Sequence, residues 1–232
     1  MPLAHDITTI RDRALTELNA AHDYYADTKI AWQLVERLIA GGRKLRIRNK
    51  TTGTVTTEAE LTGRVRGYVA ERLAEATFQT FLAVFEAFLG DLLRARLRAE
   101  PKYLMPTEPV DFPTIHAAPD KAAVIDFVVE RKVQGLFYKR PADWLKFADD
   151  KLGLGCPTAD EVERLAEAKA TRDVLIHNRG VANEVYVDKS GRRARFRVGD
   201  RVDVPEPYHR EVWELLRKVV AELSDAMTRK FP

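Results

Sequence analysis

Cysteine is almost absent from this chain, since Cys156 is the only one among 232 residues. A single thiol excludes a disulfide within the chain and any metal site built from a cysteine cluster. Histidine is scarce as well, and four of the histidines have no partner at the spacing of metal ligands: His5, His22, His116 and His209. We therefore expect neither a metal ion nor a cofactor.

Several other functional signals are also missing. No stretch approaches the roughly 20 apolar residues of a membrane span, and Met1–Asp6 lacks the basic and apolar regions of a secretory signal. The glycine pairs do not form a phosphate-binding loop. No serine or cysteine has a histidine nearby in the sequence, which disfavours an enzyme with a serine or cysteine nucleophile. We expect a cytoplasmic protein with no membrane partner.

The charges nearly balance, with 38 basic residues against 35 acidic ones and a net charge of +3. This excess alone does not indicate a nucleic-acid partner, although the basic residues are unevenly distributed. A composition of 45% hydrophobic and 31% charged residues is typical of a soluble globular protein. We expect residues 1–232 to form one domain with a substantial core.

Apolar residues recur at helical spacing along most of the chain. Two long helices are predicted, from about Ile7 to Ile39 and from about Glu60 to Arg98. The second carries a wide apolar stripe that marks a major part of the core: Phe78, Phe81, Leu82, Phe85, Phe88, Leu89 and Leu92. Shorter helices are predicted at 120–134, 141–152, 158–178 and 207–229, with a proline-rich loop over 101–119. The predicted fold class is mainly α, an antiparallel helical bundle.

Two small β excursions are expected, at about 43–57 and at about 185–204. Both carry cations of the kind that bind a phosphate backbone: Arg43, Lys44, Arg46, Arg48, Lys50, Arg193 and Arg195. In an extended strand, the even-numbered members of the first group share one face. These residues either bind nucleic acid or protect edge strands from aggregation. A DNA-binding regulator that uses the basic ribbons is one possible function.

The most informative segment is Arg172–His177, near the end of a helix that starts with a capping-box pattern at Thr158 and Glu161. It brings an arginine, a carboxylate and an imidazole together. A metal-free cleavage of a phosphodiester needs a charge stabiliser and a group that transfers protons. We therefore take Arg172, Asp173 and His177 as the candidate catalytic residues.

The geometry of an ideal helix constrains these three residues. Arg172 falls in the middle of the apolar arc, where an arginine is costly unless a partner or a charged ligand meets it. Asp173 and His177 are four residues apart, so we expect the carboxylate to orient the imidazole. Arg172 and His177 lie about 140° apart. They converge only through the length of arginine, a distorted helix end or a second copy of the helix across a dimer interface.

A structural interpretation competes with the catalytic one. In it, Asp173 and His177 form a surface pair, and Arg172 belongs to an ion pair or an interface. Glu86 lies at the edge of the aromatic stripe. It is either a half-buried carboxylate that supports the site or a rim residue paired with a nearby lysine or arginine.

Arg172–His177 resembles the signature of the HEPN superfamily, in which an arginine is followed directly by a polar residue and, a few residues later, by a histidine. The wider segment Ala170–Gly180, which includes Asn178, and the segment Phe81–Arg94 are also similar to members of that family. The resemblance implies a helical bundle, usually dimeric, and often a metal-independent endoribonuclease of toxin–antitoxin or phage-defence systems. It also implies an antitoxin or other regulatory protein as a partner. Some members are inactive binding modules.

The leading hypothesis is a homodimeric, metal-independent endoribonuclease that cleaves RNA by attack of the 2′-hydroxyl. His177 is expected to transfer protons, Arg172 to bind the phosphate and Asp173 to orient the histidine or the phosphate contact. Glu86 and Asn178 are expected to support the site. The main rival is a non-catalytic helical dimer that binds RNA, a nucleotide or a partner protein through the same groove, because binding and cleavage need the same arginine.

Overall fold

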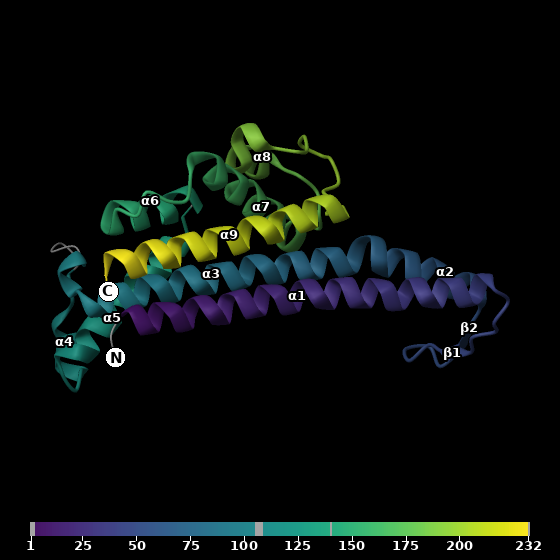
Figure 1. Cartoon of the computed structure of the whole chain (residues 1–232), viewed down its shortest axis with the longest axis horizontal. Coiled ribbons are helices and arrows are strands. Elements are labelled where there is room, and N and C mark those ends of the chain that lie inside the picture. Colours follow the sequence, from purple (N-terminus) through teal and green to yellow (C-terminus); the bar gives the residue numbers. More distant parts are fainter. Residues whose placement is uncertain (1–2, 105–108, 140, 232) are drawn as a thin grey trace.

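Two long antiparallel helices form the frame of the molecule (Figure 1). The computed structural model describes residues 3–104, 109–139 and 141–231. Helix α1 (Leu3–Ala40) runs along a return path made of α2 (Glu58–Gly67), the π-helical segment η1 (Tyr68–Arg72) and α3 (Leu73–Ala99). The last helix, α9 (Glu206–Lys230), packs on both α1 and α3. The mainly α fold predicted from the sequence is confirmed.

Apolar stripes on these three helices build the core. The stripe predicted on α3 is buried throughout, from Phe78 to Leu92. It packs against buried residues of α1, such as Leu18, and of α9, such as Leu216. Burial of each large side chain stabilises the fold by about 1.5–3 kcal/mol. This three-helix layer therefore supports the other helices.

The apolar stripe also gives α3 an unexpected property. By length and composition alone, α3 is apolar enough to cross a membrane, and 61% of its most apolar stretch is buried inside the fold. No such segment was expected from the sequence. Core helices of folded bundles meet the same criterion, because a helix that is covered by other helices is apolar on most of its surface.

Beyond the start of α9, α1 and α2 project as an arm, which we define as residues 30–72 (Figure 1). The ion pair between Lys29 and Glu206, the first residue of α9, marks its base. Its tip is an antiparallel hairpin of β1 (Ile47–Arg48) and β2 (Val55–Thr56), paired with Ile47 opposite Thr56. The first predicted β excursion is therefore present, although its strands are only two residues long.

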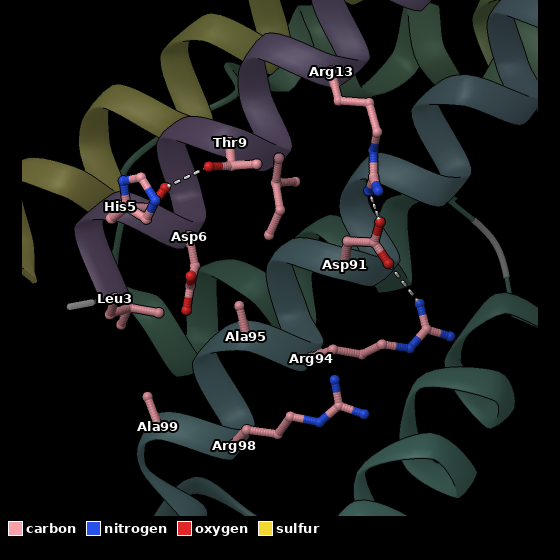
Figure 2. Close-up of a pocket in the computed structure, with 11 residues that line it drawn as sticks. Leu3, His5, Asp6, Thr9, Arg13, Asp91, Arg94, Ala95, Arg98 and Ala99 are labelled. Atoms are coloured by element: carbon pink, nitrogen blue, oxygen red, sulfur yellow. Dashed lines mark hydrogen bonds and ion pairs between the residues drawn. The ribbon is translucent and has the colours of Figure 1, made fainter. Parts of the chain in front are cut away.

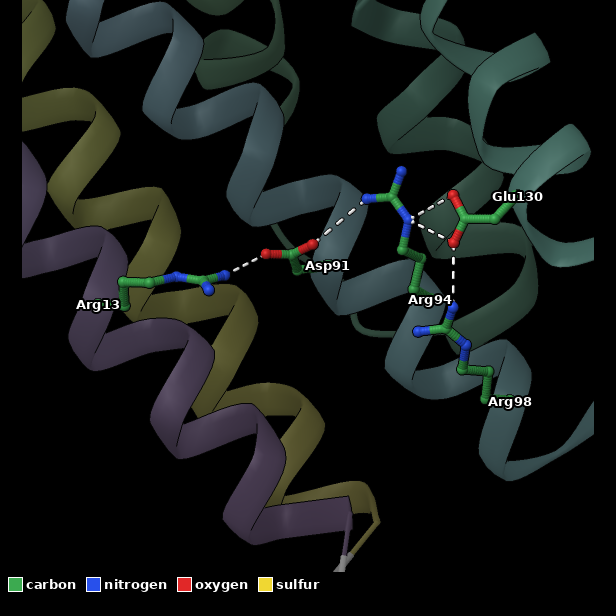
Figure 3. A network of polar contacts seen from close by, with 5 residues as sticks. All are labelled: Arg13, Asp91, Arg94, Arg98 and Glu130. Atoms are coloured by element: carbon green, nitrogen blue, oxygen red, sulfur yellow. Dashed lines mark hydrogen bonds and ion pairs between the residues drawn. The ribbon is translucent and has the colours of Figure 1, made fainter. Parts of the chain in front are cut away.

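A chain of ion pairs joins the other end of the frame to helix α5 (Lys121–Phe137) (Figure 3). Asp91 of α3 contacts Arg13 of α1 and Arg94. Arg94 Nε in turn lies 2.9 Å from both carboxylate oxygens of Glu130 on α5. These contacts fix α5 against α3.

The segment between α3 and α5 is more ordered than predicted. The expected loop over 101–119 contains a 3-10 turn, η2 (Pro101–Tyr103), and the short helix α4 (Phe112–Ala117), while residues 105–108 of that loop lie outside the described part of the chain. The Asp111 side chain accepts a hydrogen bond from Thr114 N at 2.8 Å and so caps α4. Helix α6 (Pro141–Leu152) follows α5.

The helix that carries the candidate site, α7 (Ala159–His177), begins and ends as predicted. At its start, the capping box between Thr158 and Glu161 is formed in both directions. At its end, Gly180 adopts a φ of 73° and its N–H bonds Val174 O at 3.1 Å. Glycine accepts this left-handed conformation without strain, which is why it stops the helix here.

The second predicted β excursion, at 185–204, is wrong. Val185 to Ser190 belong to a short helix, α8 (Glu184–Ser190), followed by the 3-10 turn η3 (Gly191–Arg193). The only pairing near the expected strands is an isolated bridge between Val181 and Arg201, among the residues that the structure describes. Asn183 caps α8 by accepting a hydrogen bond from Tyr186 N at 2.9 Å. Alternation over so few residues does not separate a strand from one or two helical turns.

Candidate functional site

Arg172 leaves the apolar arc of α7 by reaching an acid on α3. Its Nη2 lies 3.3 Å from Glu86 Oε2, and its Nη1 lies 3.1 Å from Asp173 Oδ1. The side chain is 18% exposed, and its Nε has no hydrogen-bond partner. Glu86 is thus the acid that compensates the arginine, as the sequence analysis allowed. The unused donor, Nε, is buried within the fold.

Asp173 is the centre of a cluster of cations. It contacts Lys169, Arg172 and Lys189, whose Nζ lies 3.5 Å from Asp173 Oδ2. Burial by itself raises the pKa of Asp173, but the hydrogen bonds and positive charges of these partners outweigh burial and hold the pKa below its usual value. Asp173 therefore stays ionised at neutral pH. It can position cations but has no proton to donate.

The expected pairing of Asp173 with His177 is not formed. Among the described residues, no hydrogen bond or ion pair joins the two side chains, because both oxygens of Asp173 face cations instead. The i,i+4 spacing made the pair possible. Lys169, which is four residues before Asp173, has the same spacing in the other direction and carries a full charge, so it takes the carboxylate.

Two lysines of this cluster were missed in the sequence. Lys169 lies one turn before Asp173, with its Nζ 3.5 Å from Glu86 Oε1, and an i,i+4 charge pattern was a signal for it. Lys189 comes from α8, in a segment where a strand over 185–188 and then a turn were expected. Three cations, including Arg172, face two carboxylates, Glu86 and Asp173. The cluster therefore has one net positive charge and favours an anion.

His177 is the last residue of α7 and is exposed. It lines a hollow of about 220 Å³ between α7 and α8. The wall also includes Asp173 and Lys189 of the cation cluster, together with Asn178 and Asn183. Arg172 does not line this hollow. Asp173 links the two other candidate catalytic residues: it lines the hollow together with His177, and it contacts Arg172.

Asn178 has a structural part in the site. It caps the C-terminus of α7, with its backbone N–H bonded to Val174 O at 3.0 Å. Its side-chain amide donates to Val181 O across the turn. These bonds fix the turn that follows His177, so Asn178 supports the position of the histidine.

The two arginines predicted after α8 are engaged within the fold. Arg195 Nε lies 3.1 Å from Glu167 Oε1, and its guanidinium stacks on the Tyr208 ring at 3.5 Å from the centroid. Glu167 is buried and also accepts hydrogen bonds from Tyr186 and Tyr208. Burial, and then the charge of Glu167, raise the pKa of Tyr208 well above its usual range, so its hydroxyl keeps the proton that it donates. Arg195 therefore contributes to the fold, and its assignment to RNA binding stays a prediction.

Arg193 is also paired, with Asp160 and with Glu163, whose Oε2 lies 3.6 Å from Arg193 Nε. Both partners lie on the first turns of α7. Arg193 remains 42% exposed, so these surface contacts hold it only weakly against a competing phosphate. It stays a candidate for RNA contact.

The basic residues at the tip of the arm are free. The side chains of all five are exposed: Arg43, Lys44, Arg46, Arg48 and Lys50. Among these side chains only that of Arg48 has a hydrogen bond to a described residue, from its Nη1 to Gly53 O at 2.9 Å. None forms an ion pair with a described residue. The expected sharing of one strand face is not formed, because only Ile47 and Arg48 are in the strand.

A larger hollow, of about 670 Å³, lies elsewhere, between the first turns of α1 and the last turns of α3 (Figure 2). Arg13, Arg94 and Arg98 line it, and each is already paired with a carboxylate. Its charges are therefore internally compensated, and no residue predicted for the site lies in it. In the described part of the chain, no three histidine, cysteine or acidic residues are grouped as metal ligands.

A buried histidine provides a contrast with His177. His209 has 0% exposure, and its Nε2 lies 2.8 Å from the Thr77 hydroxyl. Its ring packs against Tyr25 and Phe81. Burial lowers the pKa of His209 to about 4. His209 therefore belongs to the core of the bundle, whereas His177 is exposed and lies beside the cation cluster.

Comparison of the chain with protein-family models, with curated proteins and with solved structures gave no significant match. A functional assignment therefore depends on the residues and contacts described above.

Proposed function

We propose that this protein is a metal-independent endoribonuclease whose site is the second half of α7 together with α8. The observation that carries the proposal is a net positive cluster of Lys169, Arg172 and Lys189 around the ionised Asp173, adjoining the exposed His177. A phosphate contact and a proton-transfer group are the two requirements of RNA cleavage without a metal. The resemblance of Arg172–His177 to the HEPN signature is a second line of support.

In the proposed reaction, the 2′-oxygen of one nucleotide attacks its own 3′-phosphate. The bond from phosphorus to the 2′-oxygen forms as the bond from phosphorus to the 5′-oxygen of the next nucleotide breaks. One histidine accepts the proton of the 2′-hydroxyl, and an acid donates a proton to the leaving 5′-oxygen. The products are a 2′,3′-cyclic phosphate and a 5′-hydroxyl. His177 is the proton-transfer group of this scheme.

Arg172 and Lys189 stabilise the charge that develops on the non-bridging phosphate oxygens. Charge-assisted hydrogen bonds to phosphate are shorter and stronger than neutral ones, and a pre-positioned donor contributes most when the charge is greatest, in the transition state. Asp173 serves this function by holding both cations in place. Glu86 compensates Arg172 when no substrate is bound.

A homodimer completes the site. Within one protomer, Arg172 faces Glu86 on α3 while His177 lines the hollow against α8. A two-fold axis near the end of α7 brings the same surface of each copy together. The arginine of one protomer then meets the histidine of the other, and the two histidines share the roles of acid and base. The antitoxin or regulatory protein implied by the resemblance stays a prediction.

The direct test is cleavage of RNA by the purified protein in EDTA, with analysis of the product ends. We expect cleavage that is insensitive to EDTA and leaves a cyclic phosphate or its hydrolysis product. A DNA strand of the same sequence is the matched control, since it lacks the 2′-hydroxyl and must remain intact. Cleavage that needs magnesium, or that cuts the DNA strand equally well, contradicts the proposed mechanism.

One observation favours a second function, a non-catalytic module that binds RNA or a nucleotide. No described side chain orients the imidazole of His177, whereas catalytic histidines are usually held by a hydrogen bond. The cation cluster would then bind phosphate without chemistry. Equilibrium binding of an RNA that remains uncleaved after long incubation, with a loss of affinity in Arg172→Ala, would support this alternative.

A further inference from the structure

The tip of the arm is a concentrated positive charge on a projecting element. Five cations lie between Arg43 and Lys50, and no acidic residue occurs between Arg43 and Thr57. All five side chains are exposed, and none is compensated by an ion pair with a described residue. In other parts of the molecule, arginines such as Arg94 and Arg195 are paired with carboxylates. The uncompensated tip is therefore the part of the surface best suited to a polyanion.

The arm sets the distance between this charge and the body of the protein. The stretch of α1 from Lys29 to Ala40 rises about 17 Å at 1.5 Å per residue. The contact between Trp32 and Tyr68, with ring centroids 5.9 Å apart, holds it against the return helix. Figure 1 shows the hairpin at the far end of this arm, away from both termini.

The end of α7 connects to the base of the same arm. Val202 N donates to Gly180 O at 2.8 Å, directly after His177 and its turn. The next residue back, Arg201, places its Nη2 3.9 Å from Glu71 Oε2 of η1. Four residues after Val202, Glu206 pairs with Lys29. The candidate site and the arm are therefore joined at one end of the bundle.

We infer that the tip of the arm is a second RNA contact, which holds the phosphate backbone of the substrate at a distance from the bond that is cleaved. The inference rests on the proposed ribonuclease function for the position of that bond. A stacked strand advances about 3.4 Å per nucleotide, so the arm adds at least about five nucleotides to the length that the α7 site itself covers. The substrate class is RNA long enough to reach both contacts.

The composition of the tip favours a nucleic acid over an anionic membrane. The large apolar side chains exposed there are Ile47 and Val55, at 42% and 53%. Two partly exposed residues bury too little apolar surface to anchor a protein in a bilayer, where stable attachment depends on apolar burial as well as charge. Binding to a phosphate backbone, in contrast, needs only the cations and accessible space around them.

The test measures binding of RNAs of increasing length, from 4 to about 20 nucleotides, with His177→Ala as the background so that the RNA stays intact. The tip variant carries Arg43→Gln, Lys44→Gln and Arg46→Gln, which spares the Arg48 bond to Gly53. The matched control carries Lys121→Gln, Lys139→Gln and Lys146→Gln, three exposed lysines on α5, just after it and on α6. Both variants lose the same charge. Circular dichroism verifies that each remains folded.

We expect the tip variant to bind the longest RNA at least about 10-fold more weakly than its parent, and to bind the shortest equally well. The salt dependence for long RNA should fall by about 0.7 in slope for each phosphate that the tip no longer binds. The control variant should change little. An equal loss at every length, or an equal loss in the control, overturns the inference. So does a tip-dependent binding to phosphatidylserine vesicles that is absent for RNA.

This experiment also separates the inference from the proposed function. If the tip variant loses affinity for long RNA only, and the unmodified protein cleaves no RNA, the tip contact is retained and the ribonuclease function is rejected. The opposite result is also distinguishable. If the tip variant with His177 intact cleaves long RNA at the full rate and binds it with unchanged affinity, the tip contact is rejected and the ribonuclease function is retained.

Discussion

Helix α7 carries two charged clusters that differ in how completely their groups are partnered. Glu167 is 5% exposed and accepts hydrogen bonds from Thr171, Tyr186 and Tyr208 as well as the ion pair from Arg195. About one turn later, the cluster around Arg172 opens to the surface. There Arg172 Nε and Glu86 Oε1 are buried atoms without a hydrogen bond, although Oε1 has Lys169 as an ion-pair neighbour.

The difference separates groups that hold the fold from groups that remain free for a ligand. A buried carboxylate with four donors is costly to disturb, since every donor then loses its acceptor. A partly exposed cation cluster with one net positive charge, whose most exposed cation is Lys189 at 35%, gains when an anion arrives. The two clusters share one helix, so the rigid one fixes the position of the open one.

Removal of Glu167 should have the largest effect on stability. We expect Glu167→Ala to lower the free energy of unfolding by about 3–5 kcal/mol, because Arg195 and two tyrosine hydroxyls lose their acceptor. Urea unfolding measures this. Glu163→Gln, which removes surface contacts with Arg192 and Arg193, is the control and should change stability far less. Equal effects of the two changes would remove the distinction between the clusters.

Removal of Arg172 should act on function and leave the fold nearly unchanged. We expect Arg172→Ala to slow RNA cleavage by about 100- to 1000-fold, the usual cost of losing a pre-positioned charge stabiliser. The loss of stability should be about 1 kcal/mol or less, because the pair with Glu86 is partly exposed. Single-turnover cleavage and urea unfolding of the same preparation check both numbers. Severe unfolding with no specific loss of cleavage would make Arg172 structural.

Asp173 should show a smaller effect that depends on pH. Since its pKa is lowered in the folded state, the ionised carboxylate stabilises the fold above about pH 4, where it is also ionised in the unfolded chain. This advantage over Asp173→Asn, about 1 kcal/mol, should be constant at neutral pH and disappear as the pH falls through the lowered pKa. Unfolding curves of both proteins between about pH 2.5 and 7 measure it. A difference that is unchanged at the lowest pH would contradict the cation contacts of Asp173.

Local signals in the sequence were sufficient for the frame of the molecule. The capping box of Thr158 and Glu161 involves partners three residues apart, and the apolar stripe of α3 repeats with the period of a helix, so neither depends on the rest of the fold. The short strands of the tip followed from the alternation before a turn at Gly53. These features are confirmed.

The missed parts depend on distant contacts. Arg172 and Glu86 are 86 residues apart, and the sequence offered Glu86 only as one of two interpretations. Lys189 reaches Asp173 from the helix α8, whereas a strand over 185–188 followed by a turn was predicted there. Arg195 looked like a free cation until Glu167 was placed beneath it. Charge in a sequence thus indicates where a site can form, and partners in the fold decide which charges remain free.

Cleavage by His177→Ala is the measurement that tests the central claim most directly. The His177 side chain is exposed and forms no hydrogen bond with a described residue. Its removal should therefore leave stability and RNA affinity nearly unchanged. We predict that single-turnover cleavage of RNA in EDTA falls about 100-fold or more, as expected for the loss of a proton-transfer group. Cleavage at the rate of the unmodified protein would contradict the claim that the end of α7 is a ribonuclease site.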